Sequence, residues 1–124
     1  MNVVDSCGWL EYLADGPNAE SFAGPLADRD SIIIPTITIY EVFKVVARQR
    51  GEDAALQATA LMQQGKVVEL SPSLAMIAAH ISLELALPMA DSIILATSRF
   101  HGAVLWTQDE HFRTLSEVRY FPKR

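Results

Sequence analysis

MADSIILATSRFHGAVLWTQDEHF, residues 89–112, predicts a helix, a tight turn and a strand, and the rest of the chain is organised around this unit. Pro88 just before the stretch and Asp91 near its start are signals of a helix N-terminus. Gly102 lies where a helix should end, and residues 103–106 form an apolar run of strand length. Because the helix is apolar on most of its faces, we expect it to be largely buried.

Two aspartates flank this helix–strand unit. A helix that leads into a strand of a parallel sheet runs antiparallel to that strand, so its first turn lies at the edge where the strands end. Asp91 lies in this first turn, and Asp109 leaves the strand 18 positions later. We therefore expect Asp91 and Asp109 to meet at the carboxyl edge of the sheet.

The remaining sequence alternates short apolar runs with helical segments. Strands are expected at residues 2–5, 31–35, 66–70 and 118–121, and helices begin at or next to residues 6, 18, 36, 52 and 71. Ser6, Asn18 and Thr36 are expected to cap helices, because short polar side chains satisfy free backbone N–H groups. The alternation is typical of an α/β protein with a mostly parallel sheet, and no linker or repeat divides it. We expect one domain over residues 1–124.

The composition excludes several classes of protein. No run approaches the roughly 18 to 20 apolar residues of a membrane span, and the N-terminus lacks the basic region of a signal peptide. Cys7 is the only cysteine, so no intrachain disulfide can form, which favours a cytoplasmic protein. The formal net charge of −5 argues against broad electrostatic adhesion to nucleic acid, although it permits a nucleic-acid substrate held by a metal and a local basic patch.

Four acidic residues are expected at the same edge of the sheet. Asp5 ends the first strand, and Glu41 lies in the second turn of the helix after the second strand. Asp91 and Asp109 flank the unit described above, and open α/β sheets bind ligands at this edge. Two carboxylates about 4 Å apart repel each other by about 4 kcal/mol at an effective dielectric constant near 20. The four acids must therefore take up protons or share a cation.

The chemistry of these ligands narrows the function. Oxygen ligands without a companion histidine or cysteine favour a hard cation, Mg²⁺ or Mn²⁺, over zinc. Such ions suit the attack of water on a phosphodiester, because one ion activates water and a second stabilises the leaving oxygen. An aspartyl phosphatase would need a second aspartate two residues after Asp5, and Cys7 stands there, so this class is excluded. The residues predict metal-dependent phosphoryl chemistry and leave the substrate open.

Each acid also has a purely structural interpretation. Asp5 and Asp91 are candidates for helix caps. Glu41 is one turn away from Lys44 and suits a solvated ion pair with it. Asp109 is placed to cap the short turn that follows it. The shared location of the four acids favours the functional interpretation.

Four motifs of the chain resemble those of PIN-domain nucleases, most closely the VapC-type toxins of bacterial toxin–antitoxin pairs. The motifs are Val4-Asp5-Ser6 followed by a Trp-Leu helix, Thr38-Ile-Tyr-Glu41, Met89-Ala-Asp91-Ser-Ile-Ile-Leu-Ala-Thr97 and Trp106-Thr107-Gln-Asp109-Glu-His-Phe112. Their order and spacing match over nearly the whole chain. One position departs from the pattern, because many relatives have a further aspartate two residues after the last one, where this chain has His111.

The resemblance implies a three-layer α/β/α fold with a parallel sheet and an endoribonuclease that depends on Mg²⁺ or Mn²⁺. It implies Asp5, Glu41, Asp91 and Asp109 as catalytic metal ligands, with Ser6 and Thr107 as supporting hydroxyls. It also implies a homodimer, an RNA substrate, and neutralisation by a small antitoxin protein that occupies a hydrophobic groove. The alternative is a catalytically silent PIN-like module that binds RNA or protein, and the intact set of acids argues against it.

Clustered positive charge suggests where the RNA backbone would bind, with ordinary solvation as the alternative. The candidates are Lys44, Arg48, Arg99 and Arg113. For His111, contact with a phosphate and an ordinary surface position are both open. Cys7 has no base paired with it in the sequence, so a buried small apolar residue is favoured over a nucleophile.

Overall fold

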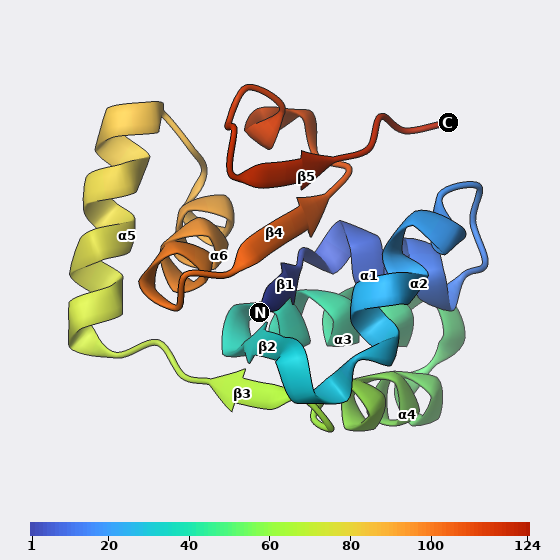
Figure 1. Ribbon diagram of the computed structural model, residues 1–124. Coiled ribbons are helices and arrows are strands. Elements are labelled where there is room, and N and C mark those ends of the chain that lie inside the picture. Colours follow the sequence, from blue (N-terminus) through green and yellow to red (C-terminus); the bar gives the residue numbers. More distant parts are fainter.

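The computed structural model describes residues 1–124 and contains five strands, six α-helices and two 3₁₀ helices (Figure 1). The strands are β1 (Asn2–Val4), β2 (Ile32–Pro35), β3 (Lys66–Val68), β4 (Val104–Thr107) and β5 (Val118–Tyr120). The helices are α1 (Ser6–Leu13), α2 (Ala19–Ala27), α3 (Thr36–Arg50), α4 (Glu52–Met62), α5 (Pro72–Leu85) and α6 (Met89–Phe100), with 3₁₀ helices η1 (Arg29–Ser31) and η2 (Glu110–Phe112). The predicted alternation of strands and helices is confirmed; η1 was not predicted.

The five strands form one parallel sheet in the order β3-β2-β1-β4-β5. The chain builds outward from β1 through β2 to β3, and then returns to place β4 on the other side of β1. The strand order therefore reverses between β1 and β4, which is where open α/β sheets bind ligands. Val4 pairs with Trp106 at this point, and the Asp5 N–H continues the ladder with a 2.9 Å hydrogen bond to the Trp106 carbonyl.

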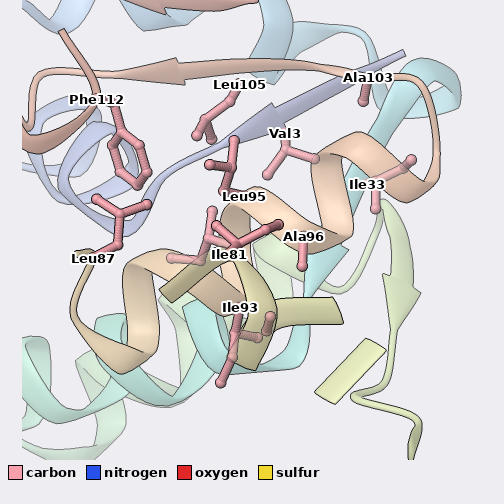
Figure 2. Close-up of a cluster of buried hydrophobic side chains, with 12 residues drawn as sticks. Val3, Ile33, Ile81, Leu87, Ile93, Leu95, Ala96, Ala103, Leu105 and Phe112 are labelled. Carbon is pink, nitrogen blue, oxygen red and sulfur yellow. The ribbon is translucent and has the colours of Figure 1, made fainter. Parts of the chain in front are cut away.

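Helices cover both faces of the sheet, and the two faces have separate hydrophobic cores. Successive residues of a strand point to opposite faces. Val3 accordingly packs with Ile81 of α5 and Leu95 of α6, in the cluster that Figure 2 shows. Val4 packs on the other face with side chains of α1 to α4, such as Trp9. This arrangement is the three-layer α/β/α architecture, and burial on both faces explains the apolar run of β2.

Helix α6 is the buried helix that the sequence predicts. Every residue from Ser92 to Ser98 is buried, and the polar side chains among them bond to backbone carbonyls. Thr97, for example, donates its hydroxyl to the Ile93 carbonyl at 2.8 Å. Gly102 follows the helix with a φ of 60°, a left-handed conformation that glycine adopts without steric strain. The chain can therefore turn directly into β4.

Three of the expected helix caps are wrong. The cap of α1 is Asp5 rather than Ser6, because the Asp5 carboxylate accepts the Ser6 N–H at 2.8 Å. Thr36 is the first residue of α3, which has no side-chain cap. Asn18 occupies the position before α2, but its amide donates instead to Gln108 and to the Pro122 carbonyl. The Asn18 side chain thus ties the start of α2 to the C-terminal part of the chain.

No single helix is long and apolar enough to cross a lipid bilayer. Only α5 and α6 taken together, bent by 116° at the break between them, meet that test of length and composition.

Candidate metal centre

The four acids come from four separate parts of the fold and lie at the carboxyl edge of the sheet. Asp5 directly follows β1 and is 3 % exposed. Glu41 lies in the second turn of α3, and Asp91 in the first turn of α6; both are half-buried. Asp109 follows β4 and precedes η2. Asp5 and Asp109 therefore follow the two neighbouring strands at the switch point, β1 and β4, as their positions after apolar runs predict.

Asp5 is held by hydrogen bonds to both of its carboxylate oxygens. The Thr107 hydroxyl donates to Oδ2 at 2.7 Å, and the Ser6 N–H donates to Oδ1 at 2.8 Å. The Thr107 oxygen in turn accepts the Asp109 N–H at 2.9 Å, so one hydroxyl joins the two acids. Asp5 is thus both a helix cap and a member of the acidic cluster, and the two interpretations of the sequence are compatible.

His111 lies between two of the acids. Its Nδ1 is 2.8 Å from Oδ2 of Asp91 and 3.2 Å from Oδ1 of Asp109. Asp109 also caps η2 by accepting the His111 N–H at 2.9 Å. The predicted meeting of Asp91 and Asp109 is seen here, with an imidazole between them. The spacing of two residues after Asp109 was the only signal in the sequence, and it left the role of His111 open.

Glu41 has no partner for one of its buried oxygens. Its Oε1 is inaccessible to solvent and makes no hydrogen bond. No ion pair joins Glu41 to Lys44, whose ammonium lies 5.7 Å from the centre of the Tyr40 ring instead. Burial and the negative charges of nearby aspartates raise the pKa of Glu41, despite a hydrogen bond from Ser6 that lowers it. The structural interpretation of Glu41 as half of a solvated ion pair is therefore wrong.

Burial and mutual repulsion act on the other acids as well. Desolvation raises the pKa of Asp5, and the charge of Asp91 adds to this effect, against the hydrogen bonds from Thr107 and Cys7. Desolvation likewise raises the pKa of Asp91, helped by the charge of Asp109, although the bond to His111 opposes the shift. The cluster therefore holds more negative charge than its surroundings stabilise.

A divalent cation fits this set of residues. Carboxylate oxygens are ligands that Mg²⁺ and Mn²⁺ prefer, and an ion would relieve the repulsion that raises these pKa values. The unpaired Oε1 of Glu41 would gain the partner that the protein does not supply. The residues suited to hold the ion are Asp5, Glu41, Asp91 and Asp109.

The Cys7 thiol belongs to the hydrogen-bond network around Asp5. Its Sγ lies 3.4 Å from Oδ2 of Asp5 and 3.4 Å from Oγ1 of Thr107. Burial, followed by the charge of Asp5, raises the pKa of this thiol to about 12. A thiol that stays protonated is a poor nucleophile, in agreement with the sequence interpretation. The expectation of a buried apolar residue is wrong, however, because the side chain is half-buried and hydrogen-bonded.

The candidate RNA contacts divide into two groups. Lys44 and Arg48 are exposed on α3, one and two turns beyond Glu41, and Arg113 is exposed directly after η2. Arg99 lies near the other end of α6, eight residues or about 12 Å along the helix from Asp91. Its guanidinium binds Glu117 at 2.6 Å. The structure therefore separates Arg99 from the acidic cluster.

An apolar groove begins beside the cluster. It has a volume of about 570 Å³, lies between α1, α3 and α4, and has side chains such as Leu13, Val46 and Leu61 in its walls. Cys7 and Gln108 also line the groove. Cys7 contacts Asp5, and Gln108 directly precedes Asp109 in the chain. A molecule bound in the groove would therefore approach the acids.

The comparisons with known proteins agree with this geometry. The family profile described as the PIN domain matches residues 3–118 of the chain. The chain belongs to the PIN-domain family. A search of curated protein sequences finds no match.

Solved structures share the fold of this PIN domain at low sequence identity. A toxin–antitoxin complex from Klebsiella pneumoniae is 21 % identical, with a TM-score of 0.79 and 95 % of each chain covered. VapC20 from Mycobacterium tuberculosis, described as a toxin that cleaves the sarcin–ricin loop, is 18 % identical, with a TM-score of 0.79 over 98 % of this chain and 100 % of that one. FitAcB from Neisseria gonorrhoeae is 20 % identical, with a TM-score of 0.73 over 98 % and 96 %.

Proposed function

We propose that this PIN domain is a divalent-metal-dependent endoribonuclease of the cytoplasm and acts as the toxin of a toxin–antitoxin pair. The observation that carries the proposal is the convergence of four acids, one with an unpaired buried oxygen, at the switch point of the sheet. The structural neighbours support the toxin role, because one of them is described as a toxin–antitoxin complex and another as a toxin that cleaves the sarcin–ricin loop.

The residues of the chain would divide the work of hydrolysis. Asp5, Glu41, Asp91 and Asp109 would hold the metal. When bound, Mg²⁺ or Mn²⁺ supplies a water of lowered pKa and positive charge for the phosphodiester oxygens. Thr107 and Ser6 fix the orientation of the Asp5 carboxylate through the hydrogen bonds at 2.7 and 2.8 Å. A carboxylate that is held in this way needs no reorganisation when the substrate binds.

The RNA backbone would lie across α3 and the end of η2. Lys44, Arg48 and Arg113 are exposed cations on or directly after elements that carry or follow the acids. Arg99 would contribute little, because its charge is already paired with Glu117. With a net charge of −5, the chain would bind RNA through these few contacts, so binding should depend only moderately on salt.

The apolar groove between α1, α3 and α4 would hold the antitoxin. A peptide helix with an apolar face suits such a groove, since apolar surface is buried on both partners. Because Cys7 and Gln108 line one end of it, a bound peptide would block access to the acids. Mixing the protein with its antitoxin should then abolish cleavage.

A homodimer is also part of the proposal. Met76 and Leu83 lie seven residues apart on α5, hence on the same face of the helix, and are 69 % and 87 % exposed. Exposed apolar side chains that share one helix face suit burial against a second copy of the chain. Light scattering should report a dimer for the parent protein and a monomer for Leu83→Glu; a parent monomer at micromolar concentration would exclude this part of the proposal.

The decisive experiment is cleavage of cellular RNA by purified, antitoxin-free protein with Mg²⁺, with Mn²⁺ and with EDTA. Asp91→Asn serves as the test variant, and Asp53→Asn, on the exposed start of α4, is the matched control. We expect discrete fragments from the parent and the control, and none with EDTA or from Asp91→Asn. An Asp91→Asn protein that cleaves RNA like its parent would contradict the proposal. Calorimetry that detects no metal uptake, even with RNA present, would favour the silent binding module.

A further inference from the structure

The imidazole of His111 adds a nitrogen to a centre otherwise made of oxygens. Asp91, Asp109 and His111 each offer one ligand atom, and the three atoms lie within 4.8 Å of one another. This inference rests on the proposed metal-dependent function and concerns which ion the centre takes. We infer that Nδ1 of His111 is a ligand of the divalent ion, and that this nitrogen makes the centre prefer Mn²⁺ to Mg²⁺.

The position of the His111 backbone is set by residues on both sides of it in the chain. On one side, Asp109 caps η2 by accepting the His111 N–H at 2.9 Å. On the other side, Phe112 is fully buried in the core between the sheet and α6, as Figure 2 shows. The backbone at His111 is thereby fixed, although the side chain is 52 % exposed. The imidazole is therefore held beside Asp91 and Asp109, and about half of it remains accessible to a bound group.

The distances around Nδ1 match those between ligands of one ion. Two ligands at right angles around an ion at about 2.1 Å from each are about 3 Å apart. Nδ1 lies 2.8 Å from Oδ2 of Asp91 and 3.2 Å from Oδ1 of Asp109. An ion can therefore take the place of the hydrogen bond with small rotations of the three side chains. Ligation needs the neutral imidazole, with its proton on Nε2.

A nitrogen ligand changes the selectivity of the centre. Mg²⁺ strongly prefers oxygen and keeps its waters, whereas first-row transition ions also accept imidazole. Replacing one oxygen position by nitrogen therefore favours Mn²⁺, and in the same sense Co²⁺, over Mg²⁺. His111→Asp would restore an oxygen ligand at the same position, and His111→Ala would remove the ligand altogether.

The test uses a readout that is independent of RNA cleavage. Mn²⁺ is bound to the parent protein, and pulsed EPR measures the coupling of the ion to nitrogen, with ¹⁵N-labelled histidine to identify the source. We expect a histidine coupling in the parent and in His80→Ala, a matched control on the exposed face of α5. We expect its loss in His111→Ala, together with a fall in Mn²⁺ affinity of about tenfold or more, as loss of even an outer-shell partner produces.

Titration with both ions completes the experiment. In His111→Asp, calorimetry should show a smaller ratio of Mn²⁺ to Mg²⁺ affinity than in the parent, with metal still bound. If Mn²⁺ binds the parent without nitrogen coupling, or His111→Ala leaves both affinities unchanged, the inference is overturned. The proposed nuclease would still stand in that case, provided that cleavage needs metal and Asp91. If neither ion binds with or without RNA, the metal-dependent function itself fails.

Discussion

The hydroxyl of Thr107 donates a 2.7 Å hydrogen bond to Oδ2 of Asp5, joining the last residue of β4 to the first residue beyond β1. Both residues are buried, and the same hydroxyl accepts the Asp109 N–H. Thr107 therefore joins Asp5 to Asp109, as His111 joins Asp91 to Asp109.

Replacing Thr107 by valine, which has nearly the same shape, should leave the Asp5 carboxylate without this donor. We expect a loss of about 1 to 3 kcal/mol of stability and a fall in metal affinity of about 10- to 100-fold. Thr59→Val is the matched control, because Thr59 is buried in α4 and bonds only to backbone carbonyls. Denaturation and calorimetry should show lower stability in both variants but weaker metal binding in Thr107→Val alone. Equal metal affinities would contradict the positioning role of Thr107.

Removing one acid should stabilise the metal-free protein. The pKa values of Asp5, Glu41 and Asp91 are raised by burial and by neighbouring negative charges, so each carboxylate is less stable here than in the unfolded chain. We expect Asp91→Asn to raise the denaturation midpoint in EDTA while abolishing activity. Glu117→Gln is a control that should instead lower the denaturation midpoint, because Arg99 helps to hold the pKa of Glu117 below its usual value. An Asp91→Asn protein less stable than the parent in EDTA would contradict this account.

The stability of the metal-free protein should fall as the pH rises. A carboxyl group with a raised folded-state pKa binds more protons in the folded state than in the unfolded state, so it disfavours folding above its ordinary pKa. The pKa of His111 is also raised, by its bond to Asp91 and by the charge of Asp109. The stability that the protonated imidazole contributes is therefore lost as the pH rises through this raised pKa. Both effects have the same sign. In EDTA, the melting temperature should be higher at about pH 5 than at about pH 7.5.

Added Mn²⁺ should reverse this trend at neutral pH, because the ion binds the ionised carboxylates of the folded state only. The rise in melting temperature should therefore be larger at about pH 7.5 than at about pH 5, where protons compete. The same scan on Asp91→Asn is the control and should show little effect of Mn²⁺. A melting temperature that millimolar metal leaves unchanged would argue against a preformed centre.

The Cys7 thiol should react slowly in the folded protein. Its pKa of about 12 leaves almost no thiolate at neutral pH, and the charge of Asp5 contributes to this shift after burial. We expect slow labelling by a disulfide reagent in the parent, faster labelling in Asp5→Asn, and complete labelling in denaturant. Rapid labelling of the native parent would contradict the raised pKa of the thiol and its hydrogen bonds to Asp5 and Thr107.

A bulky charge in the groove should separate antitoxin binding from catalysis. Ala54 lines the groove on α4, whereas Ala27 is exposed at the end of α2 and does not line the groove. We expect Ala54→Arg to cleave RNA but to lose inhibition by the antitoxin, and Ala27→Arg to retain both. Inhibition of Ala54→Arg at the parent's antitoxin concentration would place the antitoxin elsewhere.

The parts of the fold that depend on local pattern were predictable. The buried α6, the turn at Gly102 and the placement of acids after apolar strands all follow from spacing along the chain. The order of the strands does not follow from local spacing, because the pairing of β1 with β4 joins residues about a hundred positions apart. The sequence therefore predicts that the acids lie at the carboxyl edge of the sheet, but it does not predict that β1 and β4 are neighbours there.

Side-chain geometry limited the prediction of the site. The sequence offers a helix cap and a metal ligand as alternative roles for Asp5, but its two carboxylate oxygens allow both. The role of His111 is not predictable from the sequence, because the tight turn of η2, which brings its ring back to Asp91, depends on the Asp109 cap and on the packing of Phe112 in the core. Such contacts between distant segments are set by packing rather than by spacing.

The residues of the groove and those of the acidic cluster come from different parts of the chain, and are therefore synthesised at different times. Nearly all of the groove is lined by residues 7–61, and only Gln108 comes from later in the chain. Two of the four acids, in contrast, lie beyond residue 90, and Asp109 is among the last residues before β5. Under the proposed function, a chain emerging from the ribosome would expose the helices of the antitoxin groove before it carries a complete set of acids. The polypeptide would then be inactive for most of its own translation.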